Sequence, residues 1–279
     1  IIGFIVASLI LSFYAIVAGW MIAFCLSSLA NLLGMSDLAG WLTTFGLSRN
    51  VLFMGIFIVF TIGIISAGVR EGIERWSARL MPALLATLFL LVAYVLTLEG
   101  AMEGLRVYLL PDFERALSPT LIIAALGAAF FSLSLGVGTM LIYGSYINDD
   151  ENLPVVGGLV TLVDILIAVM AGFLVIPAMY VALHNGVDIF TSTGELISED
   201  TLIFTVLPEL FTTMGFAGII VSFTFFFLMS IAALTSSISM LEVPVAYVIE
   251  EHGLKRKTAV FSIGGAIALA SGIILLNFE

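Results

Sequence analysis

Residues 130–138 read FFSLSLGVG, in the middle of an apolar segment that runs from about 121 to 147. A segment of this length can cross a membrane as a helix, because a helix rises about 1.5 Å per residue and a bilayer core is about 30 Å thick. Glycine in a helix interior costs about 1 kcal/mol relative to alanine. An isolated lipid-facing helix gains nothing from two serines and two glycines at its centre, so the stretch requires another explanation.

The composition of the chain indicates an integral membrane protein. Hydrophobic residues make up 61% of the sequence and charged residues 10%, whereas soluble domains carry roughly 25% charged residues. Apolar runs of about 18 or more residues recur along the chain, and each is long enough to cross a membrane as a helix. The runs are continuous rather than alternating, which argues against a β-barrel.

Basic residues between the apolar runs indicate the orientation of the chain. Six of the nine Lys and Arg residues fall within 70–79 and 249–257, on the same side as the acidic turn NDDEN. By the positive-inside rule we expect 70–79, 148–154 and 249–257 to be cytoplasmic, and the longest loop, 184–213, to be external. The chain opens IIGFIVASLI without an initiator methionine, and we expect it to be a fragment that begins inside a span. The spans expected within a single transmembrane domain, 1–279, are 1–26, 51–69, 80–98, 120–147, 155–183, 214–248 and 258–276.

The serines and glycines of 130–138 have two interpretations. Glycine is common where membrane helices cross closely, and serine can bond to its own helix, so packing alone is one explanation. The other is a helix that unwinds at mid-membrane, which is tolerated only where the backbone lines a cavity or is buried in protein. A break of this kind offers carbonyl groups to a cation and N–H groups to an anion, and therefore suits a zwitterion.

Three further polar features lie inside apolar runs. In AALTSS at 232–237, two hydroxyls beside a backbone carbonyl offer the hard oxygen ligands that a sodium ion favours, although hydroxyls also bond to their own helix. Asp164 lies about two to three turns inside its span; an intramembrane acid usually faces a pathway, although one near a helix end can reach water. Tyr14 is central in its run, where a buried phenol needs a partner such as a substrate carboxylate.

Together these stretches resemble the neurotransmitter:sodium symporter family, the amino-acid and amine transporters with the LeuT-type fold. The resemblance rests on FFSLSLGVG followed by YGSY at 143–146, AALTSS at 232–237 and SFYAIVAGW at 12–20, which agree with the family in order and spacing. It implies an all-α, polytopic inverted-repeat bundle, incomplete here, with a discontinuous helix near 132–138. It also implies a bacterial member that covers the third to ninth spans of the family, so the chain as given should not transport alone.

The resemblance further implies a substrate site and two sodium sites. Tyr14 is similar to the tyrosine that bonds the substrate carboxylate, and Phe131 to the aromatic residue that closes over the substrate. The pocket that follows is apolar and favours a neutral, hydrophobic amino acid. The implied substrate-binding residues are Tyr14, Ile10, Phe131, Ser134, Val137, Ser236 and Met240. The implied ligands are Ala232, Thr235 and Ser236 for one sodium ion, and Ser132 and Asp164 for the other.

Chloride independence is implied by two departures from the chloride-dependent members of the family. The glutamine and serine that hold chloride there fall on Ala128 and Ala168, which cannot donate side-chain hydrogen bonds. The asparagine of those members is replaced by Asp164, whose carboxylate can supply the negative charge that chloride otherwise brings.

These features predict a sodium-coupled symporter of a neutral, hydrophobic amino acid that works by alternating access, with no cofactor. The expected partners are the amino acid, sodium and the lipid bilayer of the inner (plasma) membrane, with no nucleic acid. A homodimer is possible, and the sequence does not decide whether one forms. A non-transporting sensor, or a differently coupled carrier on the same fold, is the alternative. We do not expect an enzyme such as an intramembrane serine protease, because His184 and His252 lie too far from mid-membrane to activate Ser134.

Overall fold

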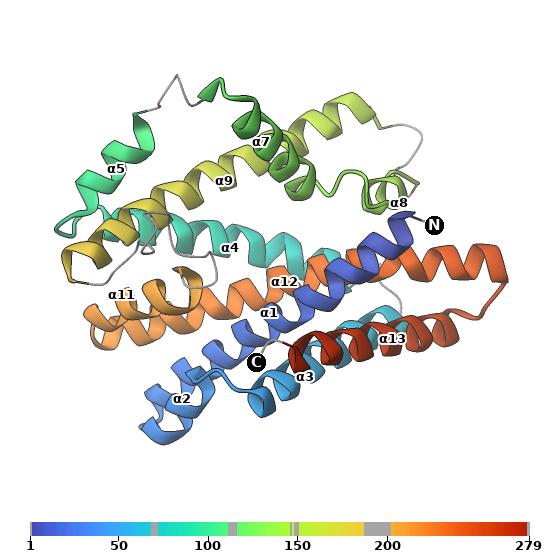
Figure 1. Cartoon of the computed structure of the whole chain (residues 1–279), viewed down its shortest axis with the longest axis horizontal. Coiled ribbons are helices and arrows are strands. Elements are labelled where there is room, and N and C mark those ends of the chain that lie inside the picture. Colours follow the sequence, from blue (N-terminus) through green and yellow to red (C-terminus); the bar gives the residue numbers. More distant parts are fainter. Residues whose placement is uncertain are drawn as a thin grey trace. The chain divides into compact units, whose positions relative to one another are not determined.

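The computed structural model describes residues 2–67, 72–110, 116–145, 147, 151–186 and 202–277. Every regular element within these ranges is a helix, which confirms the predicted all-α fold (Figure 1). Several predicted segments extend beyond the described residues. These parts are residues 1, 68–69 and 146 of the predicted spans 1–26, 51–69 and 120–147, residues 70–71 and 148–150 of the predicted cytoplasmic segments, and 187–201 of the predicted external loop.

Two compact units make up the chain. The first comprises Ile1–Ala83, Ser134–Asp149 and Phe223–Glu279, and the second comprises Leu84–Leu133 and Asp150–Ser222.

The first unit is built on three helices that pack against one another, α1 (Ile2–Leu32), α3 (Leu47–Ala67) and α13 (Arg256–Leu276), while α2 (Ser36–Thr43) packs on α1 (Figure 1). Its core also takes in the part of α12 (Phe216–His252) that belongs to this unit. The buried core residues are Leu11, Ile65, Ile238, Leu241, Val245, Ala259, Val260 and Ile267. These helices are apolar all round, as expected for helices buried in protein or lipid.

A close approach between α1 and α3 explains one glycine of this unit. A Cβ atom built on Gly19 would lie 2.7 Å from the amide nitrogen of Met54 and 2.8 Å from the carbonyl carbon of Phe53. Backbone atoms cannot move aside as a flexible side chain can. Only glycine therefore fits between these two helices, in the manner of small residues at membrane helix crossings.

We expect Gly19→Ala to lower the unfolding midpoint of the purified full-length protein, with a loss of about 1–3 kcal/mol in the free energy of unfolding because the two backbones must separate. The control is Gly63→Ala on α3, where a Cβ would meet no atom within 4 Å. Alanine favours helix over glycine by roughly 1 kcal/mol, so the control should be neutral or stabilising. Equal midpoints for the two variants, measured by thermal unfolding in detergent, would contradict the close approach.

A buried acid in the first unit has a matched cation. Glu242 on α12 is 7% exposed and accepts two hydrogen bonds from Arg256, at 3.0 and 2.7 Å. The Nε of Arg256 also donates to the carbonyl of Ile65 near the end of α3, at 3.2 Å. Because an unpaired buried carboxylate is strongly destabilising, this pair permits an acid on an otherwise apolar helix.

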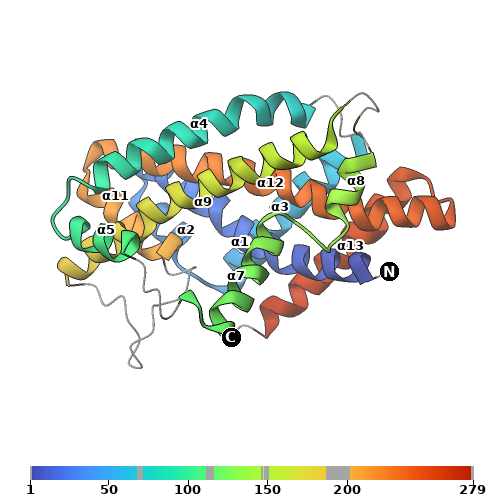
Figure 2. The ribbon, with the colours of Figure 1, turned by 90° about the horizontal axis from the view of Figure 1, so that it is seen from above.

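The second unit contains α5 (Ala101–Leu109), α7 (Pro119–Ser132), α9 (Leu153–His184), η1 (Leu202–Val206) and α11 (Leu207–Thr213), together with parts of α4 (Gly72–Val95) and α12. Figure 2 shows α5 against the later half of α9. The Tyr108 hydroxyl donates to the carbonyl of Val169 at 3.2 Å, and its ring meets Phe173 edge-on. Gly172 leaves the space that this ring occupies.

Local sequence fixes where α7 and α9 begin. The Ser118 side chain accepts a hydrogen bond from the amide of Leu121 at 3.3 Å, and the Asn152 side chain accepts one from Val155 at 3.4 Å. Each cap is followed by a proline in the first turn. Proline there has no amide hydrogen to leave unpaired, so both helices start with a cap and a stiff first turn.

Five helices among the described residues are long and apolar enough to cross a membrane: α1, α3, α9, α12 and α13. The apolar helical stretches Met81–Val95 and Pro119–Ser132 are shorter. These helices are those of a multi-pass membrane protein, and the placement of seven spans and their orientation stays a prediction.

Candidate substrate and sodium site

The helix break predicted near 132–138 is present. Helix α7 ends at Ser132, and α8 (Thr139–Ser145) begins only after a turn that is not helical (Figure 1). The break therefore falls on the serine and glycine positions of the quoted stretch, and it confirms the interpretation of unwinding over that of packing alone.

The backbone angles of the break explain its glycines. Gly136 and Gly138 have φ angles of 82° and 92°, in the left-handed region that glycine adopts without steric cost. Ser134 has a φ of 53°, the only positive φ of a non-glycine residue among those that the structure describes. Such an angle is uncommon for serine, and outliers of this kind concentrate at functional sites.

Ser134, Gly136 and Gly138 line an open pocket of about 410 Å³ within the first unit. Its walls also include Phe4 of α1 and Glu250 of α12. The unwound backbone thus lines a space, which is the condition under which irregular backbone is tolerated at membrane depth.

The start of α1 meets the same break. A Cβ atom built on Gly3 would lie 3.1 Å from the carbonyl oxygen of Val137. The first turn of α1 therefore packs directly on the unwound backbone, with its glycine at the contact.

Two of the predicted ligands of one sodium ion lie together on α12. The Thr235 hydroxyl donates to the carbonyl of Ala232 at 2.8 Å. The two oxygen atoms come from one turn of helix, and hydroxyl and carbonyl oxygens are hard ligands that suit a small cation. The third predicted ligand, Ser236, follows directly in the sequence and is exposed.

Tyr14 and Ser236 meet between α1 and α12. Their side chains lie next to each other. Tyr14 and Met240 pack against the same core cluster, which includes Leu11 and Leu241. The structure therefore brings three predicted substrate-binding residues to one place, and Ile10 lies one helical turn before Tyr14 on the same face.

In the second unit, the predicted ligands of the other sodium ion contact each other. The Ser132 hydroxyl at the end of α7 donates to Oδ1 of Asp164 on α9, at 2.7 Å. Asp164 lies about three turns into α9, away from both ends of the helix. Phe131, the predicted lid over the substrate, precedes Ser132 and is 68% exposed. That these residues and those of the first unit form one site stays a prediction.

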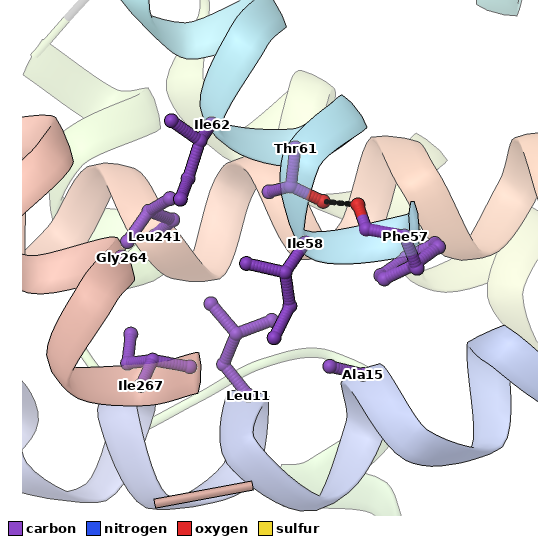
Figure 3. A pocket seen from close by; sticks show the side chains of 9 residues that line it. All are labelled: Leu11, Ala15, Phe57, Ile58, Thr61, Ile62, Leu241, Gly264 and Ile267. Atoms are coloured by element: carbon purple, nitrogen blue, oxygen red, sulfur yellow. Dashed lines mark hydrogen bonds between the residues drawn. The ribbon is translucent and has the colours of Figure 1, made fainter. Parts of the chain in front are cut away.

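An apolar pocket in the first unit belongs to the scaffold rather than to the site (Figure 3). The hydroxyl of Thr61 is its one side-chain polar group, and Figure 3 shows this hydroxyl turned to the carbonyl of Phe57, at 3.0 Å. None of the described residues that line it carries a carboxylate that could hold an ion. The lining residues are Leu11, Ala15, Phe57, Ile58, Thr61, Ile62, Leu241, Gly264 and Ile267.

Sequence reasoning assigned no role to two hydroxyl contacts of α12. Ser237, fully buried, shares a hydrogen bond of 3.0 Å with Thr61 of α3. Ser239 is hydrogen-bonded to Tyr143 of α8. The spacing of Thr235 and Ser239 carries a signal, because residues four apart lie on one face of a helix.

Among the residues that the structure describes, no three His, Cys, Asp or Glu side chains come together as a metal site would need. The first unit instead groups hydroxyls and a backbone carbonyl on α12, and in the second unit the Asp164 carboxylate meets Ser132 at the helix break. A multi-pass helical membrane protein with this arrangement has the features of an ion-coupled transporter, in which discontinuous helices supply the ligands of substrate and ion.

The chain belongs to the Sodium:neurotransmitter symporter family, whose sequence profile matches residues 32–277. It is 35% identical to the "Uncharacterized sodium-dependent transporter YhdH" of Bacillus subtilis, in an alignment that covers 98% of this chain and 60% of the relative. It is 34% identical to an "Uncharacterized sodium-dependent transporter" of Haemophilus influenzae, covering 96% of this chain and 57% of that protein. The chain thus spans about 60% of the length of these relatives.

A solved structure supports the same assignment. The chain matches the "Crystal structure of MhsT in complex with L-phenylalanine" with a TM-score of 0.86 and 35% sequence identity, over 99% of this chain and 62% of that one. Membership of the family, which the resemblance predicted, and the predicted LeuT-type fold are therefore confirmed. The family is one of sodium-dependent transporters rather than enzymes. The site residues predicted from the sequence stay predictions.

Proposed function

We propose that this chain is part of a symporter that moves a neutral, apolar amino acid across the inner (plasma) membrane together with sodium, independently of chloride. One observation carries the proposal: on α12, the Thr235 hydroxyl lies 2.8 Å from the Ala232 carbonyl, and the next residue, Ser236, contacts Tyr14. Hard oxygens for a cation thus stand beside a phenol that can donate to a carboxylate.

The apolar side chains expected around the substrate favour a hydrophobic amino acid. Ile10, Phe131, Val137 and Met240 carry no charge that would pair with a polar substrate side chain. The flexible thioether of Met240 can adapt to side chains of different shapes. The L-phenylalanine in the complex with the related MhsT is an amino acid of this class.

In the proposed transport cycle, we assign binding roles to residues of both units. Sodium is held by Ala232, Thr235 and Ser236, and a second sodium by Ser132 and Asp164 together with the substrate carboxylate. Tyr14, whose side chain lies next to Ser236, donates a hydrogen bond to that carboxylate. Occupation of these sites stabilises an occluded state, because each ligand shifts the population toward the conformation that binds it best.

The negative charge near the second sodium is assigned to Asp164. Its carboxylate accepts a hydrogen bond from Ser132, and Ala128 and Ala168 offer no donor that could hold chloride. We therefore propose that transport proceeds without chloride, and that 70–79, 148–154 and 249–257 face the cytoplasm.

The test is uptake of labelled L-phenylalanine and L-leucine by the full-length protein in proteoliposomes. We expect accumulation with an inward sodium gradient, none when potassium replaces sodium, and no change when gluconate replaces chloride. Specific binding without accumulation would contradict transport and favour a sensor. Accumulation that is driven equally by potassium, or only by protons, would overturn the sodium assignment.

A further inference from the structure

Four hydroxyl side chains within 235–239 of α12 reach four different places. Thr235 bonds within its own helix, whereas each of the other three contacts a separate element. The partners are the Ala232 carbonyl for Thr235, Tyr14 of α1 for Ser236, Thr61 of α3 for Ser237 and Tyr143 of α8 for Ser239. This short stretch is therefore a junction at which the predicted sodium ligands are held.

The contact with α8 differs from the contacts with α1 and α3. Helices α1 and α3 form the packed scaffold of the first unit, whereas α8 begins directly after the unwound break. Helix α8 and the residue directly before it approach α12 at two points. Tyr143 bonds to Ser239, and a Cβ built on Gly138 would lie 3.2 Å from Cγ1 of Val243.

The hydrogen bonds at the α8 contact have one consistent direction. The Ser239 hydroxyl donates to the backbone carbonyl of Thr235, at 3.0 Å. A serine hydroxyl has a single hydrogen, so in this arrangement Tyr143 donates and the Ser239 oxygen accepts. The resulting series of hydrogen bonds runs from the Tyr143 hydroxyl through Ser239 to the backbone of Thr235, whose own hydroxyl is a predicted sodium ligand. Successive hydrogen bonds of this kind strengthen one another.

We propose that Tyr143 and Ser239 are positioning residues that couple the placement of α8 to the sodium-ligand turn of α12. Closure of the break around a substrate moves or fixes α8, and the Tyr143–Ser239 contact then favours the turn geometry that holds sodium at Thr235. By linkage, sodium at that turn favours substrate binding to the same extent. This inference deepens the proposed function and rests on it, since it assigns a route for sodium coupling.

The experiment uses the full-length protein and three variants: Tyr143→Phe, Ser239→Ala and the double variant. Affinity for labelled L-phenylalanine is measured at high and at low sodium, with potassium keeping the ionic strength constant. When one ligand changes the affinity for another, the factor is typically five- to 150-fold. We expect each single variant to reduce the ratio between the affinities at high and low sodium about tenfold. The double variant should reduce this ratio no further than either single variant, because both residues act in the same series of hydrogen bonds.

Thr61→Val is the matched control. It removes the hydroxyl contact between α3 and α12 at Ser237, one residue from the predicted ligands, while leaving the α8 contact in place. A contact that only stabilises the fold should lower the unfolding midpoint and leave the affinity ratio unchanged. We expect Thr61→Val to behave in this way. Tyr143→Phe should instead lower the affinity ratio and leave the unfolding midpoint close to that of the wild type.

Two outcomes separate the inference from the function on which it rests. A sodium-dependent wild type whose Tyr143→Phe and Ser239→Ala variants keep the full affinity ratio would overturn the positioning role alone. The same holds if Thr61→Val lowers the ratio as much as they do. A wild type whose binding ignores sodium would overturn the proposed function, and the positioning role with it.

Discussion

Thr235→Val in the full-length protein should raise the sodium concentration for half-maximal substrate binding by roughly ten- to 100-fold. Valine has nearly the shape of threonine but lacks the hydroxyl that lies 2.8 Å from the Ala232 carbonyl. A hydrogen bond or ligand contact to a charged group is typically worth about 1.5–3 kcal/mol, and about 1.4 kcal/mol corresponds to tenfold in affinity. The measurement is equilibrium binding of labelled L-phenylalanine during a sodium titration, with potassium keeping the ionic strength constant.

Two further variants distinguish loss of a ligand from damage to the helix. Thr235→Ser keeps the hydroxyl and should retain most of the sodium affinity. Ser230→Ala removes a hydroxyl of α12 that donates to the Phe226 carbonyl of its own helix, at 2.7 Å, and it should leave the titration unchanged. An unaltered titration for Thr235→Val would remove this residue from the sodium site. An equal shift for Ser230→Ala would assign the effect to the helix as a whole.

The break in the helix could be predicted from the sequence because its signal is local. Glycine pairs and serines inside an apolar run conflict with a continuous helix, and Gly136 and Gly138 adopt the left-handed angles that only glycine enters freely. The positive φ of Ser134 could not be predicted, since serine rarely adopts it.

Pairs that are distant in the sequence were the hardest to predict. The Ser132–Asp164 contact joins residues that were assigned to the same ion only through the family resemblance. Arg256 was assigned to a cytoplasmic segment, whereas it also forms the ion pair with Glu242, a buried acid to which sequence reasoning gave no role. Burial and pairing are properties of packed helices, and apolar patterns that are uniform around a helix do not show which face meets which neighbour.

The hydroxyl contacts of α12 illustrate the same limit. Ser237 completes the TSS run, and its own helix offered a sufficient partner in the Leu234 carbonyl, at 2.8 Å. Its contact with Thr61 depends on how α3 crosses α12. Helical periodicity places Thr235 and Ser239 on one face, but the partner of Ser239 lies on α8, beyond the break.

Asp164→Asn should slow sodium-driven uptake in the absence of chloride by at least about tenfold. The substitution keeps a side-chain oxygen that can accept the Ser132 hydroxyl, and it removes the negative charge assigned to the second sodium site. Two unit charges about 4 Å apart interact by roughly 4 kcal/mol at an effective dielectric constant of 20, far more than the 1.4 kcal/mol that corresponds to tenfold. Chloride should not restore uptake, because Ala128 and Ala168 offer it no hydrogen bond.

The triple variant Asp164→Asn, Ala128→Gln, Ala168→Ser tests the reason for this result. It supplies two donors for chloride where the carboxylate has been removed, so we expect uptake to return with chloride and to fall when gluconate replaces it. The control is Ala128→Gln with Ala168→Ser in the presence of Asp164. There a second negative charge would be repelled, and uptake should not depend on chloride. Uptake by Asp164→Asn at the wild-type rate, or a wild type that requires chloride, would show that the fixed charge at residue 164 does not replace a chloride ion.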